Sequence, residues 1–369
     1  MTGVREKFAG ENASRDEPVT PPCGFSSTKS KTEPKPSLVM KPIIPFALLG
    51  ALFAVGAANA QSSTTPVGYT TTALGPNKFT FVGLTVQNPV VSAGTLDAES
   101  ANSVTDTGVD FVALLGAPGA ASGTYVLELA DGTIQEVTNW TDAGVLTTPE
   151  DITGKVTPTT TTYTLRKAAT ISDVFGANNS AGLTPDADGE YTTGNDIVYV
   201  IGAGGAATAV YYYDDGDVAG WFDALGNDAA NKPIVYADGF YVKRGAGISI
   251  DLVTTGEVKT TPTSGALTAG WNYVSSVAPV GLTLATSGLQ NFLSTDSTGE
   301  YTTVDNVYLP QPNGSFKIAY YYDDGDLAGW FDSTGGDANA LPLEGAFLIL
   351  NRGVTKPYTL SVPASYSSL

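Results

Sequence analysis

Four aspartates that lie within ten residues of one another could coordinate a hard cation. Asp214, Asp215 and Asp217 lie in one run, and Asp223 follows six residues later. Calcium takes about six to eight oxygen ligands, and carboxylates supply them readily. Clustered Asp and Gly are also typical of exposed turns, for local hydrogen-bonding and backbone reasons. The pattern leaves a calcium site and an ordinary turn both open, and its spacing does not fit an EF-hand loop.

The same run occurs again further along the chain. Residues 211–223 return as 320–332 with one difference, Val218 against Leu327. Two segments this similar, flanked by sequence that differs between the copies, indicate an internal duplication. The second copy adds four candidate calcium ligands, which are Asp323, Asp324, Asp326 and Asp332.

Each copy predicts a β-hairpin. Three consecutive tyrosines favour a strand, and Asp-Gly is a preferred centre of a tight turn because both positions accept positive φ. We expect Asp215 and Gly216 to be the two turn residues, which would place Asp214 opposite Asp217. Like charges in that arrangement weaken a sheet unless solvent or a cation lies between them.

Aromatic side chains of the same hairpin could instead stack on sugar rings. Alternation along a strand sends neighbouring tyrosines to opposite faces. Buried aromatics dominate the energetics of protein cores, so core packing is the favoured interpretation. The alternative is a carbohydrate-binding surface formed by Tyr212, Trp221, Tyr321 and Trp330.

The start of the chain predicts export. A basic start at Met40 leads into a short apolar run and a small-residue ending just before Gln61, which is the pattern of a secretory signal peptide. The run is too short and too interrupted for a comfortable membrane span. We expect residues 40–60 to be removed and residues 1–39 to be a non-native or disordered extension, with a long native leader as the alternative. No transmembrane span is expected in the mature chain.

Composition narrows the function classes. Beyond the leader the chain has 11 basic and 32 acidic side chains, a net charge of −21, which disfavours nucleic-acid binding. Cys23, the only cysteine, lies before the predicted cleavage site, and the chain has no histidine. Disulfides, histidine-based triads and His/Cys zinc sites are therefore excluded from the mature chain. We expect an extracellular or cell-surface protein, and the periplasm stays open.

Short strand-like segments separated by Gly, Pro and Asp turns predict an all-β fold built as sandwiches or barrels. We expect an N-terminal β-domain over 61–168, followed by two tandem duplicated β-sandwich or barrel-like units over 169–255 and 256–369. Residues 77–83 resemble 269–279, which indicates that strands are exchanged between these units.

Both units end in an aromatic strand followed by Arg and Gly, at Arg244 and Arg352. These arginines could bind an anion, although an ion pair with a nearby Asp is the favoured interpretation.

Several motifs together resemble a known group of sequences. They are a Val67-Gly68-Tyr69 opening, the segment 170–175, and three tyrosines ahead of a Gly-Trp pair. They resemble an uncharacterised family of exported, β-rich, internally duplicated proteins of Verrucomicrobia-type bacteria. The resemblance implies export and an all-β build, and it implies no activity and no site residues. The Asp-Asp-Gly-Asp loop departs from the plainer Gly-rich turn expected there.

Three functions follow from these observations. The first is a secreted, non-catalytic structural or adhesive protein of the cell surface or extracellular matrix, assisted by calcium and self-associating through edge strands. The alternative is a protein that binds surface polysaccharide through exposed Tyr and Trp. A glycoside hydrolase with paired carboxylates is the least favoured, because an exposed turn does not shield an acid of raised pKa.

Overall fold

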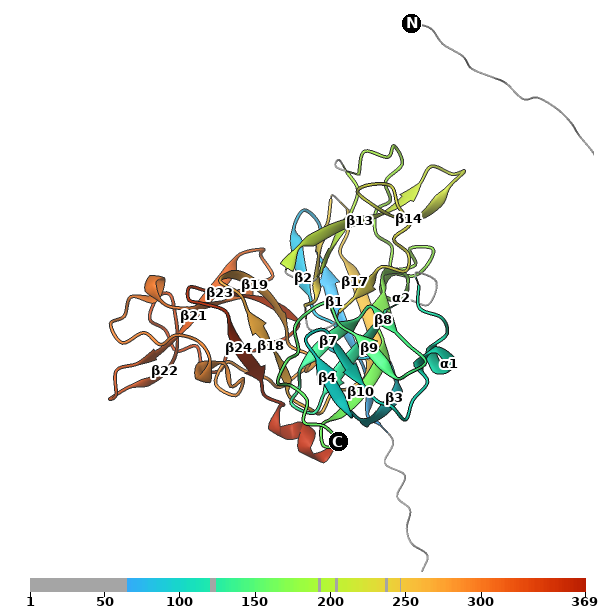
Figure 1. Ribbon diagram of the computed structural model, residues 1–369. Coiled ribbons are helices and arrows are strands. Elements are labelled where there is room, and N and C mark those ends of the chain that lie inside the picture. Colours follow the sequence, from blue (N-terminus) through green and yellow to red (C-terminus); the bar gives the residue numbers. More distant parts are fainter. Residues whose placement is uncertain (1–64, 120–123, 192–193, 203–204, 236–237, 246) are drawn as a thin grey trace, which may run out of the picture. The chain divides into compact units, whose positions relative to one another are not determined.

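A computed structural model describes residues 65–119, 124–191, 194–202, 205–235, 238–245 and 247–369 (Figure 1). The predicted leader and Cys23 lie outside these residues. Ser63–Leu369 form one unit by their contacts. In the described part of the chain, no helix is both long enough and apolar enough to cross a membrane.

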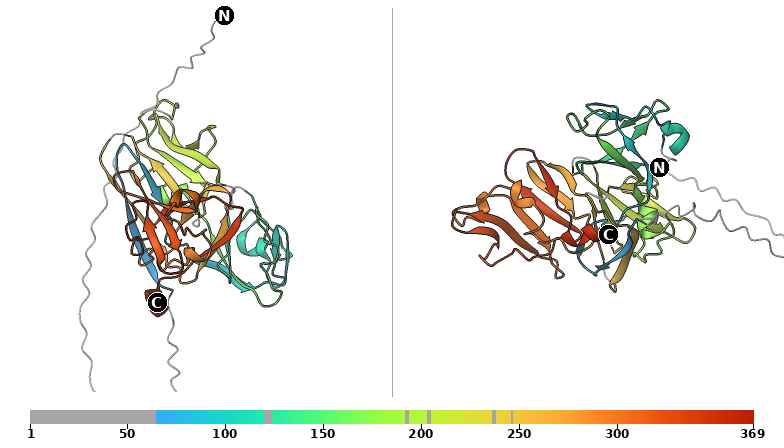
Figure 2. Two further views of the ribbon diagram at one scale, coloured as in Figure 1. Left: turned by 90° about the vertical axis from the view of Figure 1, so that its left-hand side faces the viewer. Right: turned by 90° about the horizontal axis from the view of Figure 1, so that it is seen from below.

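The fold is all-β, as predicted. Figures 1 and 2 show strands joined by loops, with only short helical segments. The segment 170–175 forms a single helical turn, and the side chain of Thr170 caps it by accepting from the Asp173 backbone N–H. The helices of the described residues are α1 (Phe111–Leu115), α2 (Ile171–Phe175), η2 (Leu289–Asn291), η3 (Tyr301–Thr303) and η4 (Ala364–Ser368).

Two antiparallel five-stranded sheets have the same strand order. The first has the order β14-β13-β12-β16-β2, and the second has the order β22-β21-β20-β23-β19. The first sheet consists of β2 (Phe79–Val82), β12 (Ile197–Ile201), β13 (Ala207–Asp214), β14 (Ala219–Asp223) and β16 (Phe240–Lys243). The second consists of β19 (Gly270–Ser275), β20 (Asn306–Pro310), β21 (Phe316–Asp323), β22 (Ala328–Asp332) and β23 (Ala346–Asn351).

Each sheet is accompanied by a two-stranded ribbon. The ribbons pair β1 (Val67–Leu74) with β17 (Ile250–Glu257), and β18 (Thr263–Leu267) with β24 (Lys356–Leu360). A further short pair joins β11 (Ala169–Thr170) to β15 (Pro233–Ile234). We call β1, β2 and β11–β17 the first module, and β18–β24 the second module. The similar segments 77–83 and 269–279 contribute β2 and β19, which are the corresponding edge strands of the two sheets.

A third set of strands interrupts the first module between β2 and β11. It forms two four-stranded sheets around a core that includes Phe111 and Trp140. The first sheet is β3 (Val90–Thr95), β10 (Thr162–Lys167), β6 (Tyr125–Leu129) and β7 (Ile134–Val137). The second is β4 (Ala98–Ser100), β5 (Ser103–Thr105), β9 (Val145–Thr147) and β8 (Asn139–Trp140).

Strand pairing therefore crosses the boundaries expected from the sequence. The unit expected at 61–168 contains β1 and β2, but their partners β17 and β16 belong to the next unit. The boundary expected after residue 255 falls inside β17. Turn residues predict pairs of neighbouring strands only, so pairing between strands far apart in the chain left no local signal.

The repeated hairpin has the same register in both modules. Tyr212 lies opposite Trp221, and Tyr321 lies opposite Trp330. The predicted turn is wrong by one residue, since Asp214 pairs with Ala219 and not with Asp217.

The turn centre is Gly216-Asp217, closed by the Asp215 backbone N–H, which donates to the Val218 carbonyl at 3.3 Å. Gly216 has a φ of 91°, as a type II′ turn requires at its first central position.

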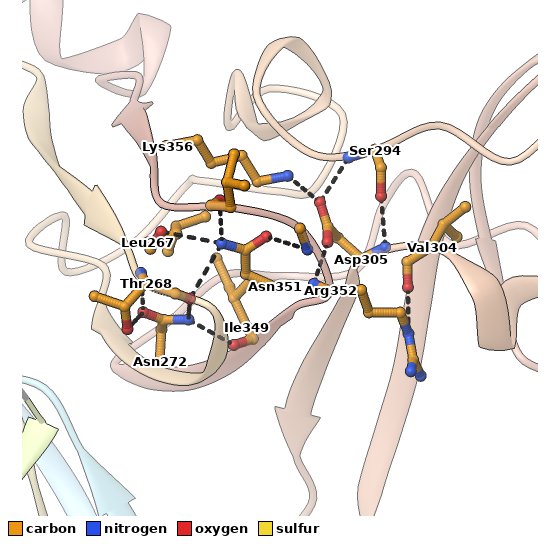
Figure 3. A network of polar contacts seen from close by, with 12 residues as sticks. Leu267, Thr268, Asn272, Ser294, Val304, Asp305, Ile349, Asn351, Arg352 and Lys356 are labelled. Atoms are coloured by element: carbon orange, nitrogen blue, oxygen red, sulfur yellow. Dashed lines mark hydrogen bonds and ion pairs between the residues drawn. The ribbon is translucent and has the colours of Figure 1, made fainter.

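A buried aspartate precedes the corresponding strands β12 and β20. Asp196 accepts from Arg244 Nε at 2.9 Å and from the Gly245 backbone N–H at 2.8 Å. In the second module Asp305 accepts from the Arg352 backbone N–H at 2.7 Å, and Lys356 supplies its ion pair (Figure 3).

Arg244 and Arg352 follow similar strands in the sequence, but their side chains make different contacts. Arg244 is buried and ion-paired, whereas the exposed Arg352 donates from Nε to the Val304 carbonyl at 2.8 Å. Lys243 pairs with Ile197 and Leu350 pairs with Asn306, so Arg244 is level with Asp196, whereas Arg352 lies one residue beyond the position level with Asp305.

The two core tryptophans provide a matched pair of mutations. Trp221 Nε1 donates to the Gly176 carbonyl at 2.9 Å, whereas Trp330 Nε1, equally buried, has no acceptor among the described contacts. Trp221→Phe breaks a buried hydrogen bond, but Trp330→Phe removes an unsatisfied donor. We expect Trp221→Phe to lose about 1–2 kcal/mol more unfolding free energy than Trp330→Phe in urea titrations. Equal losses would contradict this assignment.

Candidate functional site

The clustered aspartates are occupied by local hydrogen bonds. Asp215 accepts from the backbone N–H groups of Val218 at 2.8 Å and Asp217 at 3.0 Å, and the Tyr213 hydroxyl donates to its other oxygen at 2.9 Å. These bonds hold the pKa of Asp215 below its usual value. The Asn227 side chain, which donates to Asp223, has the same effect on the pKa of that carboxylate.

The second hairpin repeats the arrangement. Asp324 accepts from Leu327 and Asp326, and the Tyr322 hydroxyl donates to it at 2.8 Å. Asp332 accepts from the Thr334 hydroxyl at 2.6 Å and from the Gly336 backbone N–H at 3.0 Å. Within the described ranges, no group of three or more Asp, Glu, Cys or His side chains is placed to hold a metal ion. Calcium binding by the eight aspartates stays a prediction of the sequence.

The four aromatic residues predicted as an alternative ligand surface belong to the cores. Trp221 and Trp330 are each 1% exposed, and Tyr212 is 7% exposed. Tyr321 is partly buried and packs against the core of the second module. Paired residues of an antiparallel sheet point to one face, so Tyr212 and Trp221 enter the core together. Trp221, Trp330 and Tyr212 therefore have little ring surface open to a sugar, as the core interpretation expects.

The opposite face of the first sheet carries a different row of aromatic side chains. Tyr199 of β12, Tyr241 of β16 and Phe81 of β2 lie directly across from one another. The rings of Tyr199 and Tyr241 stack with centroids 4.6 Å apart and an interplanar angle of 13°. Phe81 and Phe79 both lie within 6 Å of Tyr241. None of these rings belongs to the tyrosine hairpin singled out in the sequence.

The row continues onto the second module. Tyr273 of β19 stacks on Tyr241 at 5.8 Å and 13°, and Phe316 of β21 contacts Phe81 edge-on at 5.4 Å. Tyr308 of β20 lies between Phe316 at 6.2 Å and Trp271 at 4.7 Å. We call the eight side chains the aromatic seam, which consists of Phe79, Phe81, Tyr199, Tyr241, Trp271, Tyr273, Tyr308 and Phe316.

Two tyrosines at the centre of the seam resist ionisation. Burial raises the pKa of Tyr241 to about 12, and the neighbouring Tyr273 and Tyr199 hydroxyls act in the same direction. Burial also raises the pKa of the Tyr273 phenol. Removing a phenol from water disfavours its charged form, so Tyr241 and Tyr273 present neutral rings at neutral pH.

An open hollow of about 380 Å³ lies at the exposed end of the seam. We call it the seam groove. Phe79 at its edge is 50% exposed and Phe316 is 37% exposed. Lys78 spans the groove from one module to the other, donating from Nζ to the Pro312 carbonyl at 2.7 Å. The lining residues are Asn77, Lys78, Phe79, Phe81, Pro310, Gln311, Asn313, Gly314, Ser315 and Phe316.

The groove combines two kinds of group that suit a polyhydroxylated ring. Phe79 and Phe316 offer apolar ring faces. Gln311 donates from Nε2 to the Leu309 and Pro310 carbonyls and keeps its oxygen as an acceptor, whereas Asn313 accepts from Ser315 through Oδ1 and keeps its amide donors. Ligand sites commonly pair apolar walls with a few polar groups, at volumes of about 300–1,000 Å³. The sequence signal for Phe79 and Phe81 was their alternation in a predicted strand. Nothing local indicated that Phe316 would lie beside them.

A cluster of carboxylates lines a second, much smaller hollow of about 50 Å³. Glu136 follows from β7, Glu150 from the loop after β9, and Asp238 from the loop before β16. Burial, followed by repulsion from Glu150 and Glu136, raises the pKa of Asp238 to about 7. The hollow is much smaller than the volumes of about 300–1,000 Å³ that are usual for ligand sites. Paired-carboxylate hydrolysis stays the least favoured hypothesis from the sequence.

The chain matches no protein-family model, no curated protein and no solved structure. The candidate site is therefore argued from its geometry alone.

Proposed function

We propose that this chain is a non-catalytic adhesive protein of the cell exterior that binds polysaccharide in the seam groove. One observation carries the proposal: exposed rings of Phe79 and Phe316 lie in one open groove beside amide side chains. An aromatic face covers the apolar face of a sugar ring without breaking hydrogen bonds to water, and the amides meet the hydroxyls at the ring edge. The exterior location follows from the leader pattern and the acidic composition.

An open groove suits a polymer better than a free small molecule. The neighbouring hollow, about 470 Å³, lies on the other side of the β20–β21 loop and shares Phe316, Gln311 and Asn313 with the seam groove. A chain of sugars could follow both hollows around this loop. A long polysaccharide can make several weak contacts at once, and together they raise the overall affinity. Each individual site can therefore be open and bind weakly.

Removing the exposed rings is expected to abolish most of the binding. Phe79→Ala and Phe316→Ala should each weaken binding of an array-identified glycan at least about tenfold in calorimetric titration, because each removes one stacking face. Tyr69→Ala is the matched control, since Tyr69 is 73% exposed on β1 and does not line the groove.

Thermal melting of each variant separates loss of binding from loss of folding. Binding that survives in both groove variants, or falls equally in the Tyr69 variant, contradicts the proposal. Failure of the unaltered protein to bind any glycan on a broad array contradicts it as well.

Self-association is a second candidate, favoured by the ribbon of β1 and β17. In the described sheets each strand pairs only with the other, and Gln87 bridges the outer edge of β17 only at Glu257, so most of each outer edge stays open for another chain to extend. The exposed face of the ribbon also carries apolar side chains, since Val67 is 77% exposed and Val253 is 53% exposed. Sedimentation velocity over a hundredfold concentration range should show association that Val67→Lys abolishes. A monomer at every concentration would remove this candidate.

A further inference from the structure

We infer that the glycan bound in the seam groove is anionic and carries uronic-acid carboxylates. This inference rests on the proposed function and adds the charge of the ligand. It comes from the lysines around the groove and from the contrast between Lys243, which has no ion pair among the described residues, and Lys317, which has one.

The groove has the opposite charge to the rest of the chain. The protein has 37 acidic and 18 basic side chains, yet the ten lining residues include Lys78 and no carboxylate. Lys243 lies directly opposite Phe79 in the antiparallel pair of β16 and β2. Paired residues share one face of a sheet, so Lys243 is on the same face as the groove aromatics. Two lysines therefore lie beside exposed rings in a strongly acidic protein.

Both lysines keep donors for a ligand. A lysine has three N–H donors, and Lys78 uses one on the Pro312 carbonyl. Lys243 forms no ion pair among the described residues, in contrast to Lys317 of the adjoining hollow, which is 3.2 Å from Asp332. The anion-binding capacity is thus on the Phe79 side of the β20–β21 loop, and Asp332 neutralises the lysine on the other side.

A uronate has both an apolar ring face for the aromatic side chains and a carboxylate for the lysines. Its ring has an apolar face for Phe79 or Phe316, and its carboxylate, attached at the ring edge, reaches a cation beside that face. Hydrogen bonds between an ammonium and a carboxylate are stronger than those between neutral groups. A neutral sugar would offer no anion to Lys78 and Lys243, so it would bind mainly through the rings and amides.

The test compares one oligosaccharide in two charge states. The full protein is titrated with hexagalacturonate and with the same hexamer after reduction of its carboxylates to alcohols, at low and at high salt. We expect binding of the acidic form to be about tenfold tighter and to weaken with salt, because exposed charge pairs are screened. Lys78→Gln and Lys243→Gln should each weaken binding of the acidic form several-fold and weaken binding of the reduced form by a clearly smaller factor. Lys155→Gln, remote from the groove lining, is the control.

The outcomes distinguish a wrong ligand charge from a wrong proposed function. Equal affinity for both hexamers, or preference for neutral glycans on an array, overturns the anionic inference and leaves glycan binding intact. An equal effect of Lys155→Gln also overturns it, because the attraction would then come from charge in general. Absence of binding to every acidic and neutral glycan overturns both the inference and the proposed function.

Discussion

Replacing Asp196 by alanine is expected to lower the free energy of unfolding by about 3–5 kcal/mol. The Asp196 side chain is fully buried and its partner Arg244 is 3% exposed. The carboxylate also accepts from the backbone N–H groups of Gly245 and Thr184 at 2.8 Å. The substitution therefore leaves a buried guanidinium without a counter-ion and two backbone donors without an acceptor, and each of these has a large desolvation cost.

A solvent-exposed ion pair gives the control. Lys155 lies 3.5 Å from Asp131 with both side chains about 40% exposed, and such pairs contribute less than about 1 kcal/mol. Lys155→Ala should change stability little in the same urea titrations. Asp305→Ala should fall between the two, since its partner Lys356 is 21% exposed and can regain water. A loss for Asp196→Ala within 1 kcal/mol of the Lys155→Ala value would contradict the assignment.

Replacing Asp238 by asparagine is expected to stabilise the protein at pH 8 and much less at pH 5. The folded pKa of Asp238 is about 7, above its ordinary value of 3.8. Between these values the folded state binds more protons than the unfolded state, so stability falls as the pH rises from about 4 to about 7 and then levels off. Each pKa unit corresponds to about 1.4 kcal/mol, which makes the pH 8 gain on the order of 4 kcal/mol.

The groups around Asp238 determine this effect. Glu150 and Glu136 repel its charged form, and the pKa of Glu136 is itself raised by burial. Lys232 acts on Glu136 in the opposite direction. Melting curves of Asp238→Asn and the unaltered protein, recorded from pH 5 to pH 8, should diverge as the pH rises. The exposed Asp217→Asn should show no such divergence, and parallel curves for Asp238→Asn would contradict the raised pKa.

Local patterns predicted the elements well. Alternating aromatics and the Asp-Gly turns correctly indicated the hairpins β13–β14 and β21–β22, and the core interpretation of Trp221 and Trp330 is confirmed. The turn was misplaced by one residue because the side chain of Asp215 caps the backbone of Asp217 and Val218, which favours Gly216 as the first central residue. That detail depends on hydrogen bonds that composition alone does not specify.

The amino-acid sequence by itself determined the all-β fold, the strand segments and the inward-facing residues, because alternation and turn preferences act between near neighbours in the chain. Only the tertiary structure decided that β2 completes a sheet whose other strands begin more than a hundred residues later. The same long-range pairing brought Phe79 and Phe81 beside Phe316 and created the seam groove. Residues that meet across such distances interact only in the folded chain, so no local pattern could have marked them as one site.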